Sequence, residues 1–238
     1  MLVSHRHQFI YTKTMKTAGT SVEVYFEPFC MPEAERQISH GRDEHVSDAG
    51  IVGYRGPKQH QPKVKWWNHM PAALIRERLG AEVWNSYFKF CVIRNPFDKA
   101  ISVFHFAKAR RARWGVMQPR ELLQQAKEWL AGTHRGSLKT QFKRWLSTGP
   151  LPRDYDMFMI DGQVCVDYFI RQEALADGIR HVCEKFDLPF EPDKIPRLKT
   201  SSRPRGLTCG DYYDAESVAM VRSIYQFEVD YFGYPDPI

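Results

Sequence analysis

The chain has 238 residues, 43% of them hydrophobic, which is enough to bury a sizeable core, and we expect a single domain over residues 1–238. Its 34 Lys and Arg against 28 Asp and Glu give a formal charge of +6, which favours anionic partners but identifies none. No window approaches the ~20 apolar residues of a membrane span, and the start of the chain has no apolar stretch of signal-peptide length.

The five cysteines are widely spaced and never form a C-x-x-C pair, so the sequence indicates neither a disulfide framework nor a zinc site. Reduced thiols in a cytoplasmic protein are the expectation.

The first predicted element is a strand over residues 8–14, because "QFIYTKT" alternates apolar and polar residues and is rich in β-branched and aromatic side chains. The loop "KTMKTAGTS" covers residues 13–21, and "TSVEVYFEPF" predicts a helix that ends at Pro28. In a strand, tight loop and helix arranged in this order, backbone N–H groups and the helix dipole converge on an anion.

A long, polar excursion then runs from about residue 30 to 65, with several glycines and prolines and no sustained period. Loops of this length in compact domains are often functional, so we expect acceptor contacts here, with the helices after residue 116 as a second source. A helix follows, with Pro71 at its first position and Gly80 as its stop. "SYFKFCVIR" is mostly apolar and predicts a second, central strand of a parallel sheet.

Asn95 is predicted to cap the next helix, with Pro96 in its first turn. "PRELLQQAKEWLAG" and "SLKTQFKRWLS" predict two amphipathic helices, and the Asp-Gly pair of "MFMIDGQVCVDYFI" predicts a hairpin. "EALADGIRHVCEKFDLP" predicts one late helix, and a last one runs from the cap Asp214 to Gly233. Since strands alternate with helices, the predicted class is α/β.

The loop at residues 13–21 differs from a nucleotide-triphosphatase loop, which ends in Gly-Lys, because Lys16 here comes before Gly19. The backbone N–H groups of Gly19, Thr20 and Ser21 can still wrap a phosphate beside the charge of Lys16. The second strand ends in Arg94 where a magnesium site would have a carboxylate. This pattern favours a phosphate site neutralised by side chains and not by a metal.

The segment "RNPFDKAIS" places Arg94 at the end of the second strand and Ser102 two turns into the next helix. An arginine and a serine at a strand-to-helix bend can form a second anion clamp.

Together, "KTAGTS" and "RNPFDKAIS" resemble the two cofactor-binding segments of sulfotransferases that use 3′-phosphoadenosine 5′-phosphosulfate (PAPS), in the carbohydrate-type, Golgi-like and bacterial branch. The segments "NHMPAALIRERLGAEVWNSYFKFCVIRNP", "VDYFIRQEAL" and "SSRPRGLTCGDYYD" are also similar to that family's patterns. The resemblance implies a P-loop NTPase-like three-layer α/β fold with a central parallel sheet flanked by helices. It also implies transfer of a sulfuryl group from PAPS to a hydroxyl or amine.

By position, the resemblance assigns the 5′-phosphate of PAPS to Lys16, Thr17, Ala18, Gly19, Thr20 and Ser21, and the 3′-phosphate to Arg94 and Ser102. The late segment "SSRPRG" resembles the family's basic segment near the 3′-phosphate, so Arg203 and Arg205 join this set; ordinary solvent-facing arginines are the alternative. Two positions depart from the family: Met15 stands where it often has proline, and Lys99 where it often has arginine.

Sulfuryl transfer depends on positioning and on stabilising charge at the leaving oxygen, as phosphoryl transfer does. Lys16 is the candidate for stabilising that oxygen, and Lys13, within the predicted strand, is its competitor. The family uses a histidine or glutamate as base, and His69, directly before "MPAALI", matches its histidine-led pattern. The alternative is that His69 only caps or packs that helix.

The function predicted from the sequence is transfer of a sulfuryl group from PAPS to an acceptor hydroxyl, on a carbohydrate or small metabolite, with no metal. Two other functions stay open: a small-molecule kinase with an atypical P-loop, and a non-catalytic nucleic-acid-binding protein that uses the +6 charge and "ARRAR". No nucleic-acid partner and no membrane span are expected.

Overall fold

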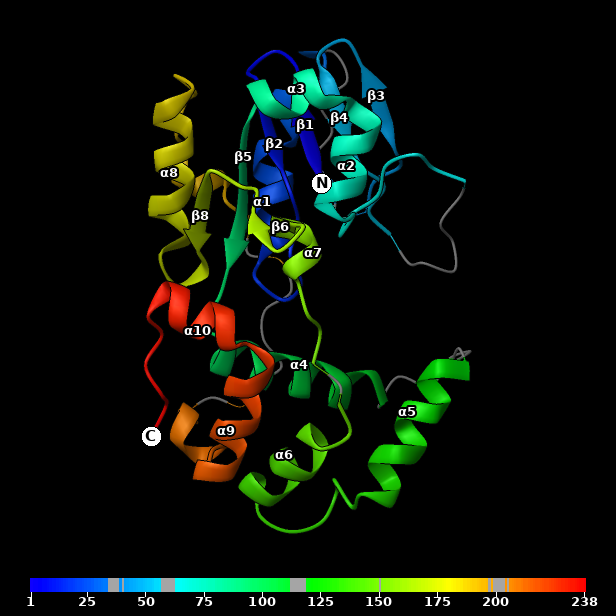
Figure 1. Ribbon diagram of the computed structural model, residues 1–238, viewed down its shortest axis with the longest axis vertical. Helices are drawn as coiled ribbons and strands as arrows, with labels where there is room; N and C mark the ends of the chain where they lie inside the picture. Colours follow the sequence, from blue (N-terminus) through cyan, green and yellow to red (C-terminus); the bar gives the residue numbers. More distant parts are fainter. Residues whose placement is uncertain are drawn as a thin grey trace. The chain divides into compact units, whose positions relative to one another are not determined.

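The computed structural model describes the chain except for residues 34–38, 40, 57–62, 112–118, 150, 197, 199–203 and 205 (Figure 1). The chain divides into two compact units. Unit 1 comprises Met1–Ile93 and Asp154–Lys199, and unit 2 comprises Arg94–Arg153 and Thr200–Ile238. The single-domain expectation stays a prediction.

Unit 1 is built on a six-stranded sheet in the order β3-β4-β1-β2-β5-β8. Its strands are β1 (Leu2–Ser4), β2 (Phe9–Tyr11), β3 (His45–Ser47), β4 (Gly50–Val52), β5 (Phe88–Ile93) and β8 (Tyr168–Arg171). The hairpin predicted at the Asp-Gly pair is confirmed: β6 (Met159–Ile160) and β7 (Gln163–Val164) pair antiparallel, and Asp161 and Gly162 both have positive φ between them.

A parallel sheet was expected, and only half of the observed six-stranded sheet is parallel. The strands β2, β5 and β8 pair parallel, whereas β1 pairs antiparallel with both β2 and β4, and β3 pairs antiparallel with β4. The sheet is therefore mixed. The antiparallel half escaped prediction because its strands have three residues each, too few to display a period.

The strands β3 and β4 lie inside the stretch of residues 30–65 that was expected to be loop, so this part of the prediction was wrong in detail. Gly50 begins β4, and a Cβ there would overlap the carbonyl oxygen of Val3 in β1. The glycine thus permits the close pairing of β4 with β1, which brings the next residues, up to Arg55, alongside the N-terminal strands.

Helices cover both faces of this sheet, as predicted for an α/β protein. The helices of unit 1 are α1 (Gly19–Phe26), α2 (Ala72–Leu79), α3 (Ala81–Ser86), α7 (Tyr155–Phe158) and α8 (Leu175–Lys185). One buried cluster joins Phe9 and Phe90 of the sheet to α1 and α8, and another joins Val3 and Ile10 to α2 and α3. Alternate strand residues thus point to opposite helical layers.

Sequence signals placed the ends of several helices correctly. The α-helical part of α1 ends before Pro28, and the chain continues as a 3-10 turn, η1 (Glu27–Cys30). Helix α2 ends before Gly80 as expected, and it begins at Ala72, one residue after Pro71, which was expected at its first position.

Unit 2 is helical in its described residues, with α4 (Pro96–Arg111), α5 (Pro119–Leu130), α6 (Leu138–Leu146), α9 (Ala215–Ile224) and α10 (Gln226–Phe232). Its core is aromatic and joins Phe104 of α4 and Trp145 of α6 to Tyr212 and Tyr225. The predicted last helix from Asp214 to Gly233 is two helices, because the backbone leaves helical geometry at Tyr225.

Within the part of the chain that the structure describes, no helix is both long and apolar enough to cross a membrane. The structure describes the cysteines at positions 30, 91, 165, 183 and 209, and no disulfide joins any two of them.

Candidate functional site

The loop between β2 and α1 has the backbone conformation of an anion cradle. Lys16 and Ala18 both have positive φ, 62° and 63°, and they alternate with residues of ordinary negative φ. Such alternation turns successive N–H groups towards one side of the chain, and it ends here at the first residue of a helix, where the helix dipole is positive.

Four consecutive N–H groups at this point, those of residues 17–20, donate no hydrogen bond to any residue that the structure describes. The first helical bond that ends on the loop comes from Ser21, which donates to the carbonyl of Ala18 at 2.9 Å. Backbone donors rarely go without an acceptor unless water or a ligand satisfies them. The loop therefore presents a row of donors suited to the oxygens of an anion.

Side-chain hydrogen bonds tie the loop to the sheet. The hydroxyl of Thr14 donates to the carbonyl of Val92 in β5 and lies 2.8 Å from the hydroxyl of Thr17. The Thr17 hydroxyl is thereby engaged with Thr14, so Thr17 offers an anion its N–H rather than its side chain. The hydroxyls of Thr20 and Ser21 form no hydrogen bond with a described residue, so they remain potential ligand donors.

Asp154 is a loop contact that the sequence analysis missed. The Met15 N–H donates to both of its carboxylate oxygens at 3.1 Å, and Asp154 is only 1% exposed. A proline at position 15, as the family often has, would have no N–H to donate. The two residues are 139 positions apart, so no local signal in the sequence pointed to this bond.

A side chain at position 19 would crowd two buried side chains, so glycine suits this position. A Cβ at this position would lie 2.8 Å from the hydroxyl oxygen of Tyr11 and 3.1 Å from Cγ of Lys13. The first turn of α1 is thus packed directly on these two side chains.

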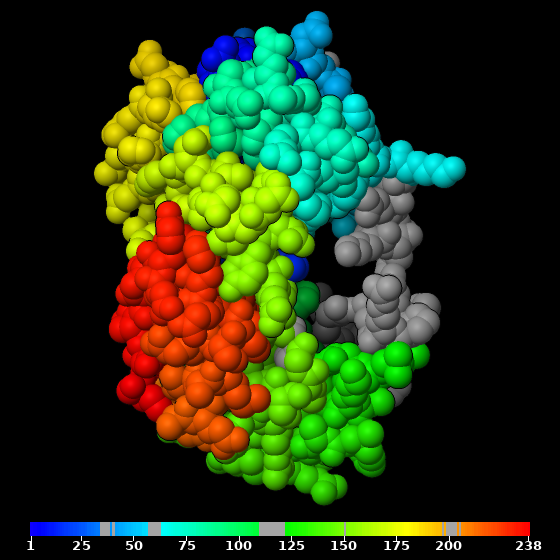
Figure 2. Space-filling view, viewed as in Figure 1, coloured from blue at the N-terminus to red at the C-terminus, as the bar shows by residue number. Residues whose placement is uncertain are grey.

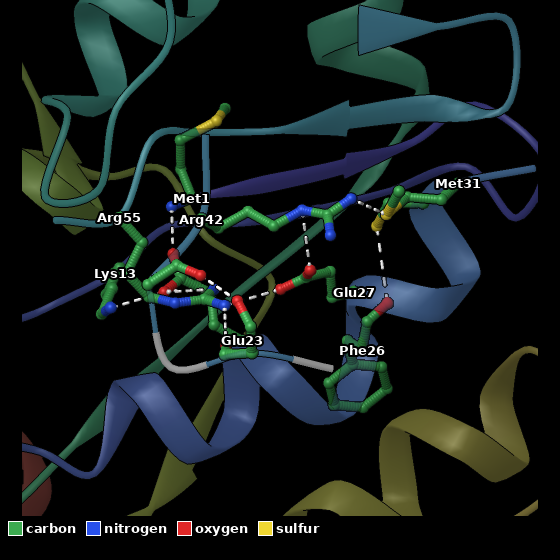
Figure 3. A network of polar contacts seen from close by, with 11 residues as sticks. Met1, Lys13, Glu23, Phe26, Glu27, Met31, Arg42 and Arg55 are labelled. Atoms are coloured by element: carbon green, nitrogen blue, oxygen red, sulfur yellow. Dashed lines mark hydrogen bonds and ion pairs between the residues drawn. The ribbon is translucent and has the colours of Figure 1, made fainter. Parts of the chain in front are cut away.

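Lys13, the competing candidate for leaving-group stabilisation, is buried in an ion-pair network beneath the loop (Figure 3). Its Nζ donates to Glu23 Oε2 at 2.5 Å, and Arg55 Nη1 lies 3.3 Å from the same oxygen. The other oxygen, Glu23 Oε1, accepts from the amino group of Met1 at 2.5 Å. Lys16, by contrast, is only half-buried at the loop itself.

The network continues one turn along the chain to Glu27. Arg55 Nη2 donates to Glu27 Oε2 at 2.8 Å, and Arg42 Nε lies 3.0 Å from Glu27 Oε1. Because Arg42 and Arg55 also exchange backbone hydrogen bonds, the network ties the excursion at residues 30–65 to α1 (Figure 3).

The two carboxylates of this network differ in acidity. Burial alone would raise the pKa of Glu23, but Lys13, the Met1 amino group and Arg55 outweigh it and hold that pKa well below its usual range. For Glu27, burial prevails over Arg55 and Arg42 and raises the pKa.

His69 lies beside the same strand end. Its Nδ1 is 3.0 Å from the carbonyl oxygen of Lys13, and since a carbonyl can only accept, Nδ1 carries the hydrogen. In the neutral ring the lone pair is then on Nε2, the atom that can take a proton. Burial, with help from the charge of Lys13, lowers the pKa of His69 to about 3.

The residues proposed for the second anion clamp lie in unit 2. Asn95 caps α4 as predicted, with its Oδ1 accepting from the N–H of Phe97 at 2.9 Å. Arg94 donates Nε and Nη2 to Asp98 Oδ2 at 2.9 and 2.5 Å, a pairing that the sequence analysis did not anticipate. Ser102 is half-buried further along α4. Asp98 thus holds the guanidinium of Arg94 at the start of α4.

Arg203 and Arg205 lie outside the described residues. Within the described part of the chain, no group of three or more His, Cys, Asp and Glu side chains is placed to hold a metal ion.

Comparison with known proteins identifies the class. The sequence profile described as "Sulfotransferase family" matches residues 1–235, so the chain belongs to the sulfotransferase family. The chain is also 30% identical, over 124 residues, to an uncharacterized protein of Archaeoglobus fulgidus, and this match covers 52% of the chain and 88% of the relative. No solved structure matches the chain.

Proposed function

We propose that this sulfotransferase uses PAPS as its donor and transfers the sulfuryl group to a hydroxyl of a carbohydrate or small metabolite. The observation that carries the proposal is the row of four N–H groups, at residues 17–20, without an acceptor among the described residues. Such a row at a helix N-terminus fits the oxygens of a nucleotide phosphate. Its place between β2 and α1 supports matching it to the 5′-phosphate segment that the resemblance assigns.

In this proposal, the 5′-phosphate is bound by Lys16, by the N–H groups of Thr17, Ala18, Gly19 and Thr20, and by the hydroxyls of Thr20 and Ser21. Arg94 and Ser102 bind the 3′-phosphate, with Arg203 and Arg205 as further candidates. PAPS, when bound, supplies the activated sulfuryl group. Lys16 stabilises the negative charge on the oxygen that leaves, the part that magnesium plays in kinases. The burial of Lys13 against Glu23 supports Lys16 for this role.

His69 is proposed as the base that takes the acceptor's hydroxyl proton on Nε2. Its Nδ1–H bond to the Lys13 carbonyl supports this, because it fixes both the ring and the tautomer. A pKa of about 3 keeps the ring unprotonated across the physiological range. An anionic sulfuryl group nearby would raise that pKa and strengthen the base.

The proposal predicts that Lys16→Ala and Arg94→Ala each abolish conversion of PAPS to adenosine 3′,5′-bisphosphate, measured with a panel of hydroxyl-bearing sugars. Circular dichroism should show both variants folded. An exposed lysine of the same unit, Lys185 on α8, gives the charge-matched control Lys185→Ala, which should keep full activity. Near-full activity of Lys16→Ala would overturn the assigned mechanism.

The same protein tests the two alternatives. A kinase would bind ATP with magnesium in calorimetry and not the bisphosphate, whereas a nucleic-acid-binding protein would bind duplex or single strands in a salt-sensitive way. Family membership favours sulfuryl transfer over both. A cytoplasmic location remains part of the proposal and rests on cysteines that are widely spaced in the sequence and form no disulfide in the structure.

A further inference from the structure

Helix α5 of unit 2 is amphipathic, and its apolar side is exposed. Four large apolar side chains are exposed along it: Leu122 (54%), Leu123 (64%), Trp129 (67%) and Leu130 (77%). At 100° per residue these positions form one continuous stripe, the apolar stripe of α5. Single exposed leucines are ordinary, but a contiguous stripe that includes tryptophan indicates a binding surface.

The polar side of α5 is the side that packs on the unit. Gln124 Nε2 donates to Thr148 Oγ1 at 2.9 Å, just after α6, and to Glu128 Oε1 at 3.0 Å. Glu128 is only 2% exposed. A surface helix of a globular protein normally has the reverse orientation, with polar residues outward. Figure 2 shows residues of α5, in bright green, on the surface of their unit.

The segment that contains α5 is strongly basic. Residues 94–153 contain thirteen Lys and Arg against three Asp and Glu, a formal charge of +10 in a chain whose total is +6. Lys127 on α5 and Arg135 just beyond it are both exposed, as is Arg144, whose Nη1 donates to the carbonyl of Gly132 beside the end of α5 at 3.2 Å.

From these observations we infer that the apolar stripe of α5 docks on an anionic phospholipid surface. Leu and Trp side chains enter the boundary between headgroups and acyl chains, while Lys and Arg remain at the headgroups. Basic residues near such a surface strengthen the attraction. A second copy of the chain fits less well, because two such segments of +10 would repel each other. This inference is independent of the donor assigned above.

The test is co-sedimentation of the full chain with vesicles of phosphatidylglycerol and phosphatidylcholine in equal parts, and with phosphatidylcholine alone. We expect binding to the anionic vesicles that weakens as salt is added, and little binding to the neutral ones. The double variant Leu123→Gln with Leu130→Gln should weaken binding at least tenfold, because it removes two apolar side chains from the stripe. Glutamine is chosen because it preserves helix propensity. Lys127→Gln should weaken it by a smaller factor, and the charge-matched control Lys185→Gln in unit 1 should not.

Folding of the double variant is checked by circular dichroism and by its affinity for adenosine 3′,5′-bisphosphate, both of which should match wild type. Failure to bind anionic vesicles, or binding that the double variant leaves unchanged, would overturn the inference. Sedimentation equilibrium provides a further check. A dimer that the double variant abolishes would show that a second copy, and not a membrane, covers the stripe.

Discussion

Glu23 and Glu27 provide a matched pair of substitutions in one buried network. Their side chains are 0% and 2% exposed, and both contact Arg55. At pH 7, Glu23→Gln should destabilise the protein by about 3–5 kcal/mol, because it removes the carboxylate that Lys13 and Arg55 face in the interior. Glu27→Gln should cost less than about 1 kcal/mol, because burial already disfavours the ionised form there and raises its pKa.

The assay is urea unfolding followed by circular dichroism at several pH values. The folded-state pKa of Glu23 lies below its unfolded value, so its contribution is complete above about pH 4.3 and is lost as the pH falls through the folded-state pKa. The difference in free energy of unfolding between wild type and Glu23→Gln should therefore shrink by about 1.4 kcal/mol for each pH unit below about 4.3. For Glu27 the difference in free energy of unfolding should change with pH in the opposite direction, because its folded-state pKa is raised. Two outcomes would contradict this prediction. One is an equal loss of unfolding free energy for the two substitutions at pH 7, and the other is a loss for Glu23→Gln that does not depend on pH.

Two further predictions concern the loop and the proposed base. Asp154→Ala should weaken the affinity for adenosine 3′,5′-bisphosphate by about tenfold or more, because the loop loses a hydrogen bond to a charged acceptor, whereas in a Met15→Pro background it should cost nothing further. If Asp154→Ala weakened the affinity just as much in the Met15→Pro background, Asp154 would not act through the Met15 N–H. His69→Asn should lower kcat by about 10²–10⁴ with the nucleotide affinity unchanged, because asparagine tolerates the φ of 58° and keeps an amide donor for the Lys13 carbonyl. The wild-type kcat/KM should show no acid limb from His69 between about pH 5 and 8, since its pKa is about 3 and the ring stays neutral there. A limb near pH 6.5 that disappears in His69→Asn would contradict the assigned protonation state.

The elements that the sequence predicted well carry strong local signals. The start of α1 at Gly19 was predicted from the alternating strand and the tight loop before it. The start of α4 was predicted from the cap Asn95, which a proline follows. The hairpin at Asp161 and Gly162 needed only its turn pair. In each case the signal lies within a few residues of the feature that it determines.

The features that escaped prediction depend on contacts between distant residues. Strands of three residues become strands only by pairing, so β1, β3 and β4 left no period to detect. Asp154 reaches Met15 across 139 positions, and Glu23 meets Arg55 across 32. The sequence placed Lys13 in the first strand, whereas its charge is buried against Glu23, a contact that only the packing of α1 creates.

We propose above all that the loop at residues 13–21 binds the phosphate of an adenosine bisphosphate without a metal. Calorimetric titration of the wild-type protein with adenosine 3′,5′-bisphosphate, in buffer containing a chelator, tests it most directly. We expect binding that Lys16→Ala weakens by about tenfold to a hundredfold and that Lys185→Ala leaves unchanged. Binding of ATP that requires magnesium, with no affinity for the bisphosphate, would contradict it.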